Sequence, residues 1–102
     1  MSDVRLGVLL WSQATDWPSF ERGATRVEEL GYDSLWTWDH LYAIFGDPYQ
    51  PIFEGWMTLA AWAKVTSRVR LGLLVGANTF RNPGLVAKEA ATLDHISDGR
   101  AV

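Results

Sequence analysis

The sequence contains no cysteine, which excludes a disulfide scaffold and any metal site built on thiolates. This absence fits a reducing compartment, so we expect a cytoplasmic protein. No run of about 18 apolar residues is present, and the first residues lack a signal-peptide pattern, so we expect no membrane span. The net charge is only −3, which argues against a surface for nucleic acid or anionic membranes.

Several motifs that indicate particular chemistries are also missing. The turn after the first apolar run begins with Trp11 and contains no glycine, whereas a dinucleotide-binding sheet usually carries Gly-x-Gly-x-x-Gly there. No Gly-x-Ser-x-Gly occurs, so a nucleophile elbow is excluded. The two histidines, His40 and His95, stand in no metal-binding spacing, so we predict no metal site and a structural role for His95.

What the sequence does contain is typical of one small globular core. A chain of 102 residues is too short for two ordinary domains. Its composition, 48% hydrophobic and 21% charged, is too apolar for a disordered protein. Six of the residues are tryptophan, a high number for this length. An excess of aromatic residues indicates either a core or a site for a flat ligand, and composition alone leaves both open.

Apolar runs and helical patterns alternate along the chain. We predict helices between Asp16 and Gly31, over residues 53–65, and from Asn82 to Ile96, with apolar residues recurring every three or four positions. Asp16 and Asn82 are suitable N-caps, each followed by a proline in the first turn, and Gly31 is a suitable C-terminal stop. The predicted strands cover residues 4–11, 34–38, 69–75 and 100–102.

The spacing of these strands predicts the fold class. The strands begin near positions 4, 34, 69 and 100, and the spacing between successive starts is the length of a βα unit. The alternation of strands and helices requires the strands to be parallel. The first strand nearly repeats in the third, as alternate strands of a (β/α)8 barrel do when they fill the same interior layer. A doubly wound open sheet is the alternative.

A whole barrel needs about 250 residues. We therefore expect an α/β fold that forms the N-terminal portion of such a barrel, about three βα units and the start of strand four. Residues 1–102 would be an incomplete N-terminal segment of a single barrel domain, and unstable or oligomeric in isolation because its edge strands are unpaired.

In a barrel, the carboxyl ends of the strands form the working face. Three sets of residues converge there: 11–13, Asp39 with His40, and 76–79. An imidazole beside a carboxylate can move a proton near neutral pH, although a turn cap next to a packed histidine is the simpler interpretation. Gly76 indicates either a close backbone approach to a ligand or an ordinary turn. The long loop over residues 39–51 is of the kind that is often functional.

Four segments in this order resemble the luciferase-like monooxygenase superfamily, most closely its members that use coenzyme F420. The segments are residues 31–40 (GYDSLWTWDH), 68–72 (RVRLG), 78–83 (NTFRNP) and 91–100 (ATLDHISDGR). The resemblance implies a (β/α)8 barrel with the ring of the cofactor in its mouth, and many relatives use flavin mononucleotide (FMN) instead. Ile44 stands where the sugar-phosphate dehydrogenases of the superfamily carry a tryptophan, so the resemblance does not extend to their substrate.

The resemblance also implies site residues. Asp39 and His40 match the catalytic acid–imidazole pair beside the ring, and the Leu74–Val75 bond matches a non-prolyl cis peptide that backs it. With the strand-end residues, the predicted cofactor-binding set is Trp11, Asp39, His40, Leu74, Val75, Gly76, Ala77 and Asn78.

The resulting expectation is an oxidoreductase that transfers a hydride between a small organic substrate and F420 or FMN, and that is a homo-oligomer at full length. The family's phosphate-binding and further catalytic elements follow the fourth strand, so we expect this chain alone to be inactive. Two rival functions remain open, namely an inactive barrel fragment and an aromatic-lined barrel segment that binds carbohydrate or another small molecule.

Overall fold

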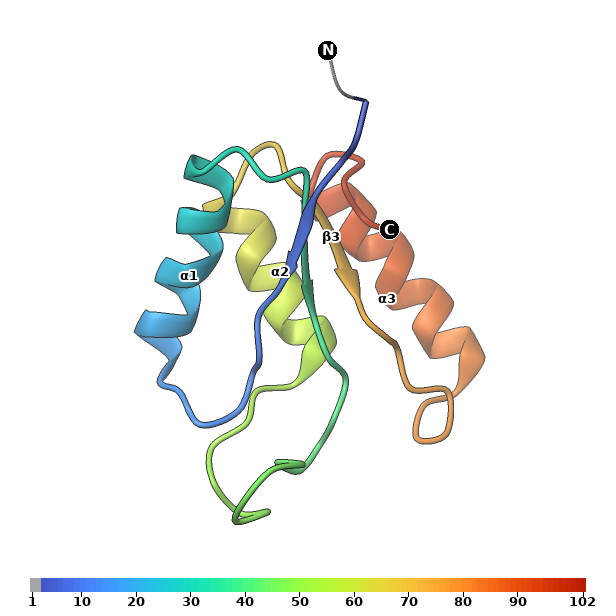
Figure 1. The fold of residues 1–102 in the computed structure, drawn as a ribbon. Helices are drawn as coiled ribbons and strands as arrows, with labels where there is room; N and C mark the ends of the chain where they lie inside the picture. Colours follow the sequence, from blue (N-terminus) through green and yellow to red (C-terminus); the bar gives the residue numbers. More distant parts are fainter. Residues whose placement is uncertain (1–2) are drawn as a thin grey trace.

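The computed structural model describes residues 3–102 as three strands that alternate with three helices (Figure 1). In chain order the elements are β1 (Gly7–Leu9), α1 (Trp17–Glu29), β2 (Ser34–Thr37), α2 (Gly55–Val65), β3 (Arg70–Leu73) and α3 (Pro83–Ile96). The predicted order of elements is confirmed, although the strands are shorter than the predicted ranges because the backbone ladder ends before the apolar runs do.

The three strands form one parallel sheet in the order β1-β2-β3. In its central register, Leu35 of β2 lies between Val8 of β1 and Leu71 of β3. Ala101 forms a parallel bridge with Leu71, so the chain returns to the free edge of β3 after α3. This bridge lies where the sequence predicted the start of a fourth strand.

Each helix begins at a side chain that accepts backbone N–H groups. Asp16 accepts from the amide of Ser19 at 2.9 Å, and Asn82 accepts from the amide of Gly84 at 2.8 Å. Both caps agree with the sequence prediction. The second helix begins later than predicted because Glu54 caps it, and its carboxylate accepts from the amide of Met57 at 2.7 Å.

The core lies between the sheet and the helices. Its buried members are Phe20, Ala24, Val27, Leu35, Leu59, Trp62, Ala63, Val69, Leu71 and Leu93. In α3, however, only Leu93 is buried, while Leu85 and Ile96 are 54% and 41% exposed. The periodicity of this helix predicts an inward apolar stripe that includes Leu85 and Ile96, and this prediction is wrong at these two positions because no segment of residues 3–102 covers them.

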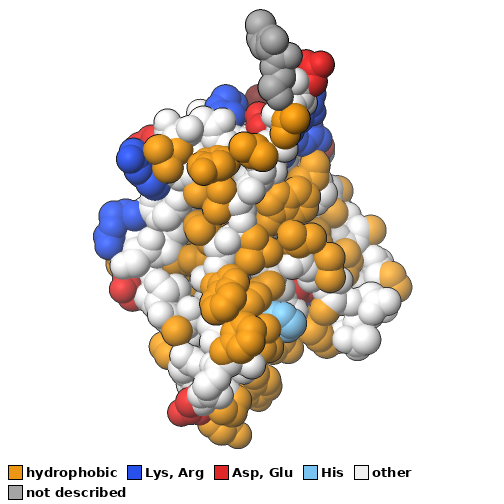
Figure 2. All heavy atoms as spheres, in the orientation of Figure 1, with side chains coloured by type: hydrophobic (Ala, Val, Ile, Leu, Met, Phe, Trp, Pro, Cys, Tyr) orange, Lys and Arg blue, Asp and Glu red, His pale blue; other side chains and the backbone are white. Residues whose placement is uncertain are grey.

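The opposite face of the sheet is organised by Trp36. Its indole lies against Gly7 of β1 and Gly72 of β3, so closely that a Cβ on Gly72 would lie 2.4 Å from Trp36 Cζ3. Trp36 Nε1 donates to Ser34 Oγ at 2.8 Å, which fixes the ring along its own strand. Figure 2 shows hydrophobic side chains gathered on the face of the molecule over these strands. This face has the character of a barrel interior, with glycine beside a large side chain.

Two ionic side chains secure the amino-terminal edge of the sheet. The Glu28 carboxylate accepts the backbone N–H groups of Ser67, Arg68 and Val69 at 2.7–3.0 Å. Partial burial alone would raise the pKa of Glu28, but these donors and the charge of Arg100 outweigh it, so the pKa lies below its ordinary value. Arg100 donates to the carbonyl oxygens of Ala63, Thr66, Val69 and Ser97. These contacts stabilise the fold at the edge away from the strand ends.

Candidate functional site

The carboxyl ends of the three strands lie at one edge of the sheet, as predicted. Leu10 at the end of β1 donates its N–H to the carbonyl of Trp36 at 2.9 Å. Ala77 in the segment after β3 donates its N–H to Asp39 Oδ2 at 2.8 Å. The residues that follow β1, β2 and β3 are therefore neighbours in space, although they are far apart in the sequence.

An aromatic cluster lies at the ends of β1 and β2, formed by Trp11, Trp38, His40 and Phe45. The Trp11 ring stacks on Trp38 at 4.9 Å and on Phe45 at 5.0 Å between centroids. Trp38 is buried and donates from Nε1 to Ser12 Oγ at 2.6 Å, whereas Trp11 is 53% exposed. The cluster therefore has a fixed inner ring and an outer ring that is open to a bound molecule.

His40 is exposed and meets Trp38 edge-on, with 5.4 Å between the ring centroids. Within residues 3–102 its imidazole makes no hydrogen bond, so both nitrogens are available. An acid–base catalyst first requires a group that can exchange protons with a bound molecule, and the His40 side chain at the end of β2 meets this requirement.

The loop over residues 39–51 is held in place by Gln13. This buried side chain donates to the carbonyl of Phe45 at 2.9 Å and accepts from the amide of Ile44 at 2.8 Å. Gln13 also forms an antiparallel bridge with Ile52 at the far end of the loop. One side chain from the end of β1 thus positions the loop that carries Phe45.

Asp39 points into the protein, and its side chain is only 1% exposed. Its carboxylate is bound by both terminal nitrogens of Arg81, which also forms an ion pair with Glu54. The hydrogen bonds to Asp39 raise the pKa of Arg81 above its ordinary value, with burial opposing and Glu54 adding to the effect. Arg81 lies 42 residues from Asp39 and 27 residues from Glu54, and neither Arg81 nor Glu54 was among the predicted site residues.

The segment after β3 contains the cis peptide bond Leu74–Val75 that the resemblance implied. Leu74 and Val75 are 51% and 71% exposed, so both present apolar surface at the strand ends. A Cβ at Gly76 would have its nearest neighbour at 3.8 Å, so this glycine is not required by packing within the described chain. Asn78 lines a cavity of about 360 Å³ together with Gly76, Ala77 and the helix residues Trp56 and Val86.

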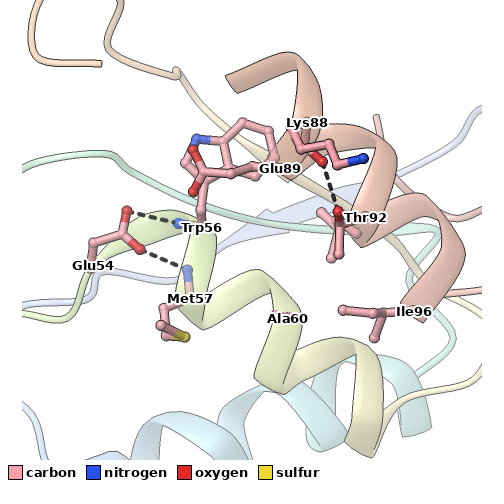
Figure 3. Close-up of a pocket in the computed structure, with 9 residues that line it drawn as sticks. Glu54, Trp56, Met57, Ala60, Lys88, Glu89, Thr92 and Ile96 are labelled. Carbon is pink, nitrogen blue, oxygen red and sulfur yellow. Dashed lines mark hydrogen bonds between the residues drawn. The ribbon is translucent and has the colours of Figure 1, made fainter. Parts of the chain in front are cut away.

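Other hollows lie away from the strand ends. A groove of about 220 Å³ lies between α2 and α3 (Figure 3), and its lining includes Trp56, Met57, Ala60, Lys88 and Ile96. It contains none of the predicted site residues. In the part of the chain that the structure describes, no three carboxylate or imidazole side chains cluster as metal ligands would, and no helix is long and apolar enough to span a membrane.

Comparison with known proteins identifies the family of the chain. The family model for luciferase-like monooxygenases matches residues 4–102. The F420-dependent glucose-6-phosphate dehydrogenase of Amycolatopsis mediterranei is 38% identical over 81 residues, which cover 78% of this chain and 24% of that enzyme.

Two solved structures of similar fold are F420-dependent enzymes. An F420-dependent secondary alcohol dehydrogenase in complex with an F420–acetone adduct has a TM-score of 0.85 and 26% identity, over 95% of this chain and 29% of its own. The F420-dependent tetrahydromethanopterin reductase of Methanopyrus kandleri has a TM-score of 0.78 and 28% identity, over 99% and 26%. The chain thus spans about a quarter of the length of its relatives, and the predicted fold class, a part of a (β/α)8 barrel, is confirmed. The chain therefore belongs to the luciferase-like monooxygenase family, and its relatives include F420-dependent oxidoreductases.

Proposed function

We propose that the full-length protein is an oxidoreductase that transfers a hydride between a small organic substrate and coenzyme F420, with FMN as the alternative cofactor. The F420-dependent activities of several relatives support an F420-dependent reaction. The observation that carries the proposal is the free imidazole of His40, which lies at the same strand edge as the aromatic cluster and the Leu74–Val75 bond. A small-molecule substrate and a homo-oligomeric protein are part of the proposal.

The residues present fit a flat aromatic ring. Such a ring needs apolar surface along its faces and polar groups at its edge. Trp11, Leu74 and Val75 supply exposed apolar surface, and His40 supplies the polar group. These residues, together with Gly76 and Ala77, would hold the ring.

Bound F420 would supply the hydride chemistry through its deazaflavin ring, and the residues of this chain would position that ring and control protons around it. His40 would give or take the proton that accompanies the change at the substrate, through either ring nitrogen. Trp11 and Phe45 would exclude water from the strand ends, since their stacked rings lie on the side formed by the loop over residues 39–51. Asp39 is already bound by Arg81 and Ala77, so we assign it to holding the site and not to proton transfer.

The proposal is tested by absorbance titration of the full-length protein with F420 and, separately, with FMN. We expect saturable binding of one of them, followed by a change of its redox state when a substrate is added. A first substrate panel contains secondary alcohols and glucose 6-phosphate, the classes named for two relatives. Binding of neither cofactor would contradict the proposal, and sugar binding without a cofactor would favour a carbohydrate-binding protein.

A further inference from the structure

Arg81 joins two acidic side chains, Asp39 and Glu54, that come from different segments of the chain. Its Nη1 and Nη2 atoms donate to the two carboxylate oxygens of Asp39, the second at 2.8 Å, and Nη2 also donates to Glu54 Oε2. The Arg81 and Asp39 side chains are 9% and 1% exposed, while Glu54 is 40% exposed. Arg81 therefore neutralises a buried carboxylate at the end of β2, which would be costly to bury without a partner.

Each carboxylate in this group holds a second segment of backbone. Asp39 accepts the amide of Ala77 at 2.8 Å. Glu54 accepts the amides of Trp56 and Met57 at the start of α2, as Figure 3 shows. The arginine clamp, defined as Arg81, Asp39 and Glu54, thus ties together the end of β2, the start of α2 and the segment after β3.

The clamp fixes one end of the Leu74–Ala77 segment. The other end is fixed by backbone alone, because Leu74 donates its N–H to the carbonyl of Thr37 at 2.8 Å. Ala77 depends instead on the Asp39 side chain, whose orientation depends on Arg81. Loss of Arg81 should therefore release the Ala77 end while leaving the Leu74 end attached.

We propose that Arg81 is a positioning residue that, through Asp39, holds the Leu74–Ala77 segment in the geometry that receives the cofactor ring. The role of Arg81 in cofactor binding rests on the proposed function. Its role in holding the Leu74–Ala77 segment does not. The two neighbouring residues then have separate roles, because Asp39 anchors the segment while His40 stays free for protons.

The test compares Arg81→Gln, Arg81→Lys and wild type in the full-length protein, with Arg26→Gln as the matched control. Arg26 also forms an ion pair, with Glu29 on α1, but both side chains are 65% exposed. Amide hydrogen exchange at Ala77 and Leu74 is measured without cofactor, and the dissociation constants of F420 and FMN are measured by absorbance.

We expect exchange at Ala77 to accelerate at least tenfold in Arg81→Gln, exchange at Leu74 to change much less, and cofactor affinity to fall about tenfold. Arg81→Lys keeps the charge but loses the paired geometry of the guanidinium, so it should give intermediate values. If Arg81→Gln does not fold, the same two measurements on Arg81→Lys test the proposal. The control should match wild type in both measurements.

Two results would overturn the inference. One is an Ala77 exchange rate in the Arg81 variants equal to that of the control. The other is faster exchange with unchanged cofactor affinity, since the clamp would then serve the fold alone. If wild type binds neither cofactor, the proposed function fails, and the exchange rates at Ala77 and Leu74 decide whether Arg81 positions this segment.

Discussion

Replacing Gly72 by alanine tests the close contact on which the open face of the sheet is built. The new Cβ would lie 2.4 and 2.7 Å from two carbons of the Trp36 ring and 3.1 Å from Val102 Cγ2. The ring cannot move freely, because Gly7 lies on its other side and its Nε1 is bonded to Ser34. Alanine at this position should therefore force either the strand or the indole to shift.

The magnitude follows from opposing effects. Overpacking costs about 1–3 kcal/mol, and loss of the Ser34 hydrogen bond would add about 0.5–1.5 kcal/mol. The lower entropy of the unfolded chain with alanine returns about 0.4–1 kcal/mol. We expect Gly72→Ala to lower the free energy of unfolding of the full-length protein by about 1–3 kcal/mol, measured by urea denaturation.

A double-mutant cycle with Trp36→Leu isolates the contact. With the indole removed, Gly72→Ala should cost almost nothing or slightly stabilise the protein. Gly76→Ala is the matched control for stability, because its Cβ would meet its nearest neighbour at an ordinary 3.8 Å. An equal cost of Gly72→Ala in both backgrounds, or no cost in either, would refute the packing argument.

Three further predictions concern stability and the loop. Glu28→Gln should lower the free energy of unfolding by about 1–2 kcal/mol at neutral pH, against little change for the exposed Glu29→Gln, by urea denaturation. Because the pKa of Glu28 is lowered in the folded state, this difference should be lost as pH falls below the ordinary range of glutamate, and a constant difference would contradict it. Arg100→Lys should cost about 2–4 kcal/mol in the same assay, since a lysine cannot reach all of the carbonyl groups that Arg100 binds, and a stability equal to wild type would contradict this. Gln13→Ala should speed proteolysis and amide exchange in the loop at Phe45, and an unchanged loop would show that Gln13 does not hold it.

Local patterns in the sequence were enough to predict the order of the elements and the shared edge at which the carboxyl ends of the strands lie. The caps at Asp16 and Asn82 depend on residues two or three positions away, so the sequence alone could identify them. The parallel order of strands then required Asp39 and the residues near Ala77 to meet, and they do.

The rest depends on contacts between distant residues. Neither Arg81 nor Glu54 was predicted as a site residue, because glutamate is not a preferred N-cap and an arginine in a loop usually faces solvent. Only the three-dimensional structure shows that Arg81 binds Asp39 and that Glu54 binds Arg81. The exposure of Leu85 and Ile96 was missed for a similar reason, since periodicity predicts an apolar stripe but not what covers it.

The most direct test of the central claim is the single-turnover rate of hydride transfer in wild type and His40→Ala. The comparison uses the full-length protein saturated with the cofactor and substrate that the titration and panel identify. If His40 moves the proton at this strand edge, the variant should lose about 10²–10⁴-fold in rate while its cofactor dissociation constant changes by less than about tenfold. An unchanged rate in His40→Ala would contradict the claim.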